Sequence, residues 1–175
     1  MNIFIKNKNA MPKKIFTGGK TAFRGAVAVE FALVLIPLLV LMMGVTEYGR
    51  ALFQYNTLAK AVRDSARFLT SQNPADASYA LAEARCLTVY GNTGCTGQPL
   101  APGLTVAMVR VCNSASAASA DCPAGAFNAF GTGLGSINLV EVRIVGYRFN
   151  SFLTFVPALN EIVFNDIHTT MRQVL

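Results

Sequence analysis

The sequence RGAVAVEF, at residues 24–31, and the apolar residues that follow it decide the fold. Twenty residues run from Ala26 to Val45, and Glu30 is the only charged one among them. A helix rises about 1.5 Å per residue, so this segment would be roughly 30 Å long, the thickness of a bilayer core. We therefore expect a transmembrane helix over residues 26–46, bent at Pro37.

Glu30 has two interpretations. A lone carboxylate costs about 2.5–3.5 kcal/mol at the centre of a membrane and less near its edge. Glu30 lies near the start of the helix, where the dipole favours a negative charge, and one interpretation is that it simply reaches the headgroup layer. The other is that cleavage after Gly25 turns Ala26 into a free α-amino terminus. That ammonium group can pair with Glu30 of a neighbouring subunit, which offsets the desolvation of both charges.

The residues around Gly25 fit a prepilin-type cleavage site, with Arg24 before the glycine, small residues after it and an aromatic residue at Phe31. The pair Gly18-Gly19 is a weaker alternative, because a cut there would place Arg24 where the acid should be. In an ordinary secretory signal the small-residue cleavage site follows the apolar segment, whereas here it precedes that segment. We expect residues 1–25 to be a basic leader and the anchor to be retained.

The positive charge of the chain is local. Six of its fifteen Lys and Arg residues and none of its nine acids lie before Ala26, so the remainder is neutral although the whole chain carries +6. A nucleic-acid partner is therefore not expected. By the positive-inside rule the N-terminus is cytoplasmic and the C-terminal domain is exported.

The helical pattern continues past the anchor. Apolar residues at spacings of three and four predict that residues 47–70 are an amphipathic continuation of the same helix, with a coiled-coil stalk as the alternative. This expected stripe consists of Tyr48, Leu52, Tyr55, Ala59, Val62, Ala66 and Leu69, and the expected wet side of Arg50, Gln54, Lys60, Asp64 and Arg67.

Residues 71–175 are expected to form an exported α+β domain, in which a small antiparallel sheet packs on the outer half of the long helix. A second helix is expected to be capped by Asp76 or Ser78 and to end near Tyr90. Three strands are expected at residues 104–111, 139–149 and 161–171, with Val140, Val142 and Ile144 inward and Glu141 and Arg143 outward. Residues 113–125 and 131–135 are expected to be loops, and residues 152–157 a turn with exposed aromatic side chains.

All four cysteines lie on the side of the anchor that the charge rule assigns to the exterior. An even number of cysteines in a small exported domain favours disulfides. Three pairings are open, and the short loops Cys86–Cys95 and Cys112–Cys122 are favoured because neighbours in sequence meet most easily. Zinc is the alternative, although neither CxxC nor a cysteine–histidine spacing typical of zinc sites occurs.

No catalytic constellation is evident. His168 is the only histidine and is interpreted as structural, and the nine acids are scattered without a facing pair. We expect no enzyme activity, no cofactor and no metal, so the exported part should act by contact. The phenylalanines Phe149, Phe152 and Phe155 are candidates for core or contact residues.

Residues 24–67 resemble the signature of TadE-like proteins, which are pseudopilins of the tight-adherence (Flp) pilus system. The matching features are a basic residue with glycine, a Val-Glu-Phe-Ala motif, a proline in the anchor, an acid followed by Gly-Arg, and a closing Ala-Arg. Here they are Arg24-Gly25, Val29–Ala32, Pro37, Glu47 with Gly49-Arg50, and Ala66-Arg67. A TadG-like identity is less compatible with the length of the chain, and residues 71–160 carry no family signature.

The resemblance implies a minor pilin-like subunit at the bacterial inner membrane, cleaved between Gly25 and Ala26 by a prepilin peptidase. Its implied partners are other Tad or Flp pilins and pseudopilins, the inner-membrane assembly platform and the lipid bilayer. Glu30 would guide processing or assembly. The alternative is a single-pass, membrane-anchored periplasmic binding protein whose leader is never removed.

Overall fold

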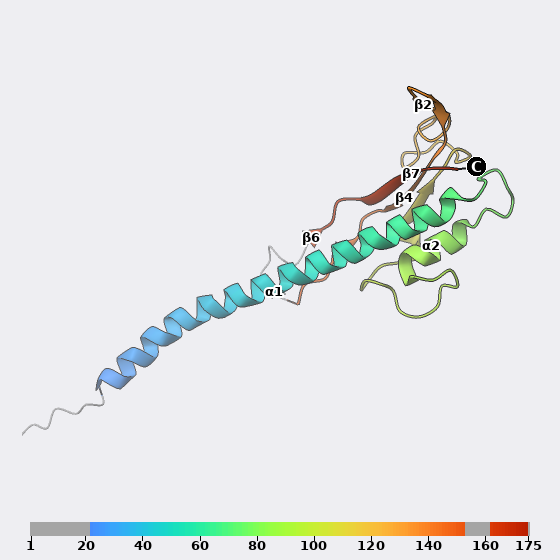
Figure 1. Ribbon diagram of the computed structural model, residues 1–175. Helices are drawn as coiled ribbons and strands as arrows, with labels where there is room; N and C mark the ends of the chain where they lie inside the picture. The colour runs from blue at the N-terminus through green and yellow to red at the C-terminus, as the bar shows by residue number, and fades with distance from the viewer. Residues whose placement is uncertain (1–21, 153–161, 175) are drawn as a thin grey trace, which may run out of the picture. The chain divides into compact units, whose positions relative to one another are not determined.

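The computed structural model describes residues 22–152 and 162–174, with side chains from Gly25 onward (Figure 1). Its first element is one helix, α1, at Ala22–Thr70, which is 49 residues long and contains Pro37. The expected continuous helix through the anchor and beyond it is confirmed. It ends at Thr70, four residues before Pro74, because proline cannot continue a helix. Arg67 in its last turn complements the helix dipole.

The chain divides into two units, Met1–Met42 and Met43–Leu175. In the first unit the side chains of α1 between Gly25 and Met42 are apolar except for Glu30, and all but the half-buried Leu35 are exposed. This part of the helix is long and apolar enough to cross a membrane, and none of its most apolar stretch is buried by protein.

In the second unit α1 buries one face against the domain, but the face is not quite the expected stripe. Val62, Ala66 and Leu69 are buried as expected, whereas Tyr48 and Tyr55 are exposed. From Glu47 to Leu58 each buried residue lies one position before the expected one, and the buried face includes polar residues. It consists of Glu47, Ala51, Gln54, Leu58, Ala61, Val62, Ser65, Ala66 and Leu69.

A three-stranded antiparallel sheet, in the order β1-β4-β7, packs on this face of α1 (Figure 1). Its strands are β1 at Val109–Cys112, β4 at Leu139–Ile144 and β7 at Ile167–Arg172. Val140, Val142 and Ile144 are fully buried in the core with α1, as expected from their alternation. The α+β class and the sheet on the long helix are thus confirmed.

One residue of the central strand β4 contradicts the expected alternation. Glu141 should face water but is only 7% exposed. Its carboxylate accepts hydrogen bonds from Arg143 Nε at 2.8 Å and from Thr170 Oγ1 at 2.9 Å. Because its partners come from β4 itself and from the neighbouring β7, the sheet covers Glu141 without leaving it unpaired.

The boundaries of the other elements differ from the expected ones in several places. The strand expected from Leu104 begins only at Val109, after a 3₁₀ turn at Val106–Met108. Residues 131–135, expected as a loop, belong to a hairpin of β2 at Phe130–Thr132 and β3 at Gly135–Ile137.

The two longest expected strands are each interrupted. The strand expected over residues 139–149 breaks at Gly146, whose φ of +68° suits glycine, and resumes as β5 at Arg148–Phe149. The strand expected over 161–171 consists of β6 at Ile162–Val163, which pairs with β5, and of β7.

Two disulfides join Cys86 to Cys95 and Cys112 to Cys122, the pairing favoured from the sequence. The first ties the helix α2, at Leu81–Tyr90, to the loop that follows it. The second closes the loop after β1, where Cys112, Cys122 and Phe127 form a small separate core. The first bridge closes a segment that begins in the last turns of α2, and the second closes a loop without helix or strand.

Candidate functional site on the long helix

The structure places the expected cleavage residues near the start of α1. Gly25 and Ala26 are exposed, and apart from its chain neighbours and the adjacent helix backbone no described atom lies within 4 Å of the position that a Cβ on Gly25 would take. The peptide bond between them lies in the first turns of the helix. Glycine in a helix is about 1 kcal/mol less favourable than alanine, so this turn opens more easily than its neighbours.

Glu30 and Phe31 lie one to two turns further along, and both side chains are exposed. Their neighbours on the helix surface are exposed apolar side chains, including Val27, Val29, Leu33 and Val34. Among the side chains of residues 25–152 and 162–174, none forms an ion pair or a hydrogen bond with Glu30. Within the described chain this carboxylate is therefore uncompensated.

A second carboxylate on α1, Glu47, has the opposite environment. It is 7% exposed, and its Oε1 accepts a hydrogen bond from Arg50 Nη1 at 3.0 Å. Arg50 Nη2 donates to the backbone oxygen of Asn150, and the guanidinium lies 4.9 Å from the ring centroid of Phe149 and 3.9 Å from that of Phe152. The Glu47–Arg50 pair thus fastens α1 to the segment after β5.

This role of the pair was not predicted from the sequence. The sequence pattern places Arg50 on the wet side of the helix and marks Glu47 only as part of a family signature. Their spacing of three residues on a helix was the available signal, because side chains so spaced are neighbours. Of the three candidate phenylalanines, Phe149 is buried, Phe152 is exposed beneath Arg50, and Phe155 lies outside the described residues.

Two further polar contacts join α1 to the domain. Tyr147 Oη lies 3.0 Å from Gln54 Oε1 and 3.1 Å from the backbone oxygen of Pro102. Burial raises the pKa of the Tyr147 phenol, and the positive charge of Arg50 opposes this shift. Further along, Thr88 Oγ1 of α2 donates to Ser65 Oγ at 2.8 Å. Gln54 was expected on the wet side of the helix, and its burial corrects that expectation.

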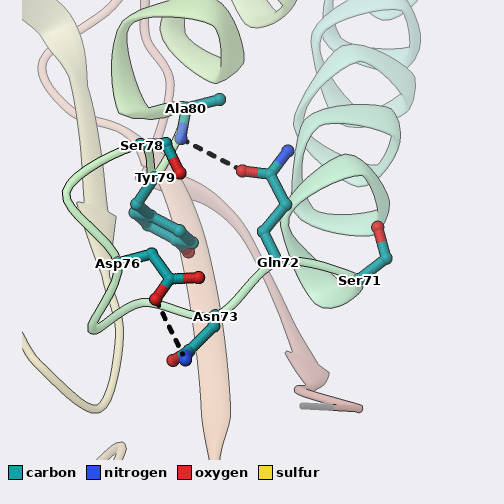
Figure 2. A pocket seen from close by; sticks show the side chains of 7 residues that line it. All are labelled: Ser71, Gln72, Asn73, Asp76, Ser78, Tyr79 and Ala80. Atoms are coloured by element: carbon teal, nitrogen blue, oxygen red, sulfur yellow. Dashed lines mark hydrogen bonds between the residues drawn. The ribbon is translucent and has the colours of Figure 1, made fainter.

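The far end of α1 forms a polar hollow with the loop that leads to α2 (Figure 2). Gln72 Oε1 accepts the backbone N–H of Ala80 at 3.0 Å, and Asn73 Nδ2 donates to Asp76 Oδ1 at 3.4 Å. The expected cap of the second helix is therefore wrong: Ala80 occupies the cap position, and its own N–H is satisfied by Gln72, which lies in the turn after α1. These hydrogen bonds lie within the connection between α1 and α2, so the hollow is part of the junction between the two helices.

His168 is exposed on β7, with Nδ1 3.3 Å from the backbone oxygen of Asp166. Within the part of the chain that the structure describes, no three His, Cys, Asp or Glu side chains come together as metal ligands do.

An exposed apolar helix followed by a disulfide-bonded α+β domain fits a single-pass membrane protein. Residues 25–67 match the TadE-like protein family, in agreement with the resemblance noted in the sequence, and the match supports a protein associated with the Tad pilus. The matched range contains Glu30 and the Glu47–Arg50 pair and ends before α2 and the sheet. No curated protein and no solved structure matches the chain.

Proposed function

We propose that this chain is a minor pilin-like subunit that a prepilin peptidase cleaves between Gly25 and Ala26 and that acts in the assembly of a Tad or Flp pilus. The observation that carries the proposal is Glu30. It is the fifth residue after Gly25, it is exposed in an apolar segment, and no described side chain of its own chain pairs with it. Residues 25–67, which include it, match the TadE-like family.

The proposal assigns the missing partner to another subunit. Cleavage creates an ammonium group on Ala26, four residues before Glu30. In a stack of subunits the ammonium of one chain lies close to the carboxylate of the next, and each charge reduces the desolvation cost of the other. The leader must be removed first, because without cleavage Ala26 has no charge to offer.

The exported domain acts by contact rather than by catalysis in this proposal. The partners are the peptidase, the other pilins and pseudopilins, and the assembly platform of the inner membrane. The N-terminus lies in the cytoplasm and the domain in the periplasm, as the basic leader favours.

One observation favours an alternative, a single-pass anchored periplasmic binding protein that keeps its leader. Helix α1 starts at Ala22 and runs through Gly25 without interruption, so the folded chain does not present an extended segment there. Under this alternative Glu30 only reaches the headgroup layer.

The mature N-terminus separates the two functions. The full chain is extracted from membranes of cells with an active prepilin peptidase, and its intact mass is measured. We expect a chain that starts at Ala26. Gly25→Leu should leave the leader attached, while the matched control Gly18→Leu should be processed normally. An intact leader on the wild-type chain, or loss of processing in the Gly18 variant alone, would contradict the proposal.

A further inference from the structure

The turns of α1 just beyond the anchor expose apolar side chains. Between Glu30 and Lys60 the sequence contains only two charged residues, Glu47 and Arg50. Glu47 and Arg50 are hydrogen-bonded to each other, and Arg50 also bonds to Asn150 of the domain. Gln54, the next long polar side chain, is 8% exposed. Between Glu30 and Lys60 the outward surface of α1 therefore carries no exposed charged side chain over 29 residues.

Large apolar side chains occupy that surface. Phe53 is 71% exposed and Tyr48 is 67% exposed, while Leu52 and Tyr55 are nearly half exposed. Beside them lies a hollow of about 300 Å³, lined by Tyr48, Ala51, Leu52, Tyr55, Ile162 and Phe164. Tyr55 and Phe164 meet edge to face in its wall, with ring centroids 5.7 Å apart. We name the exposed residues from Val45 to Tyr55 the interfacial collar.

The collar ends abruptly. From Asn56 onward the exposed residues of α1 are polar or charged, and they include Asn56, Lys60, Arg63, Asp64 and Arg67. The change falls within one turn of the helix, between Tyr55 and Lys60. Such a sharp change indicates a boundary between an apolar and an aqueous surrounding rather than a gradual decline in hydrophobicity.

We propose that the interfacial collar lies in the outer interfacial layer of the lipid bilayer, so that the domain rests on the membrane surface. From Phe31 to Tyr55 the helix rises about 36 Å. This exceeds the hydrocarbon core of roughly 30 Å and fits within the roughly 40–45 Å that include both headgroup layers. Tyrosine is enriched at this depth, because its ring is apolar and its hydroxyl reaches water.

The bilayer is the occupant that the observations favour over a second copy of the chain. The collar continues the exposed apolar surface of the anchor along the same helix, from Val40 through Val45 to Phe53. A membrane-spanning anchor is surrounded by lipid, and the same lipid bilayer would cover the collar if it reached about three helical turns further along α1. The inference holds whether or not the leader is cleaved.

The chain contains no tryptophan, so a single introduced indole reports its own surroundings. The test uses the full chain, one copy per nanodisc, with lipids brominated near the headgroup or near the chain end. Phe53→Trp and Tyr48→Trp report on the collar. Val34→Trp, in the middle of the anchor, and Arg67→Trp, beyond the collar, are the matched controls. All four positions are exposed, so no core packing is lost.

We expect both collar variants to lose about half of their fluorescence with the shallow bromines and less with the deep ones. The Val34 variant should respond most to deep bromines, and the Arg67 variant to neither. The proposal is overturned if the collar variants behave like the Arg67 control. It is also overturned if their emission shifts to shorter wavelength only when several copies share a nanodisc, because a second chain then covers the collar.

Discussion

Two carboxylates on one helix, Glu30 and Glu47, show how differently the same chemical group is treated in the two units of the chain. Glu47 is buried, and Arg50 of the next turn supplies its counter-charge. Glu30 lies in an exposed apolar surface without a counter-charge among the described side chains. The first carboxylate fastens a domain to its own helix, and we propose that the second pairs with a group of another chain.

The leucines of α1 provide the largest contrast between the two units. Leu58 is fully buried in the core, whereas Leu39 is exposed in the anchor. Leu58→Ala should lower the free energy of unfolding of the domain by about 3 kcal/mol, because it removes apolar contacts and leaves a cavity. Leu39→Ala should leave it unchanged.

Denaturant unfolding of the full chain in nanodiscs, followed by the near-ultraviolet signal of the tyrosines, measures both variants. Equal destabilisation by the two substitutions would mean that the anchor unit is packed against protein and would remove the contrast.

The Glu47–Arg50 pair should have the next largest effect. Arg50→Ala leaves the Glu47 carboxylate buried without its cation and removes the contacts to Asn150 and the two phenylalanines. We expect a loss of about 2 kcal/mol in the same unfolding measurement, reduced from the value for fully buried pairs because the Arg50 side chain is partly exposed.

The double variant Glu47→Gln with Arg50→Ala should recover part of that loss, because it removes the unpaired charge. If the double variant is as unstable as the sum of the two single variants, the two residues are not coupled and the pair does not fasten the domain.

Tyr147→Phe should cost less, about 1 kcal/mol, because it removes one neutral hydroxyl and leaves Gln54 Oε1 without its partner. Burial raises the folded pKa of this phenol above its unfolded value of 10.0. Its contribution is therefore complete below pH 10 and is lost as the pH rises through the folded pKa.

The variant should accordingly lose stability less steeply above pH 10 than the wild type, as measured by unfolding at several alkaline pH values. Tyr79, whose pKa burial also raises, keeps a remaining slope in both proteins. Identical slopes in the two proteins would show that Tyr147 ionises equally in the folded and unfolded states.

The sequence was most informative where residue type and spacing act locally. The run from Ala26 to Val45 predicted the anchor, and the alternation of Val140, Val142 and Ile144 predicted the buried face of β4. The same holds for the disulfide pairing, because the cysteines of each loop are close in sequence.

The errors in assigning buried and exposed residues share one cause: polar groups whose partners come from elsewhere in the chain. The sequence pattern predicts that Gln54 and Glu141 are exposed. In the structure Gln54 is hydrogen-bonded to Tyr147 and Glu141 to Thr170, and both partners are distant in sequence. An apolar stripe drawn without Gln54 then shifts toward Tyr48 and Tyr55. The cap of α2 was also wrong, because Ala80 occupies the cap position and its N–H bonds to Gln72 in the turn after α1.

For the candidate site the sequence supplied the acid and the glycine of the proposed cleavage site, and the structure contributed the contrast with Glu47. A composition with one acid in twenty apolar residues marks Glu30 as unusual. Only three-dimensional contacts distinguish an acid with a partner in its own chain from one without.

The direct test of this contrast is co-purification of Glu30→Gln and Glu47→Gln with the other pilus components from cells with an active prepilin peptidase. We predict that Glu30→Gln still accumulates in the membrane, whether or not its leader is removed, and that its domain has normal stability. It should no longer co-purify with its partners. Glu47→Gln should still co-purify if its domain folds. A Glu30→Gln subunit that assembles like the wild type would show that no neighbouring charge meets this carboxylate and would contradict the account.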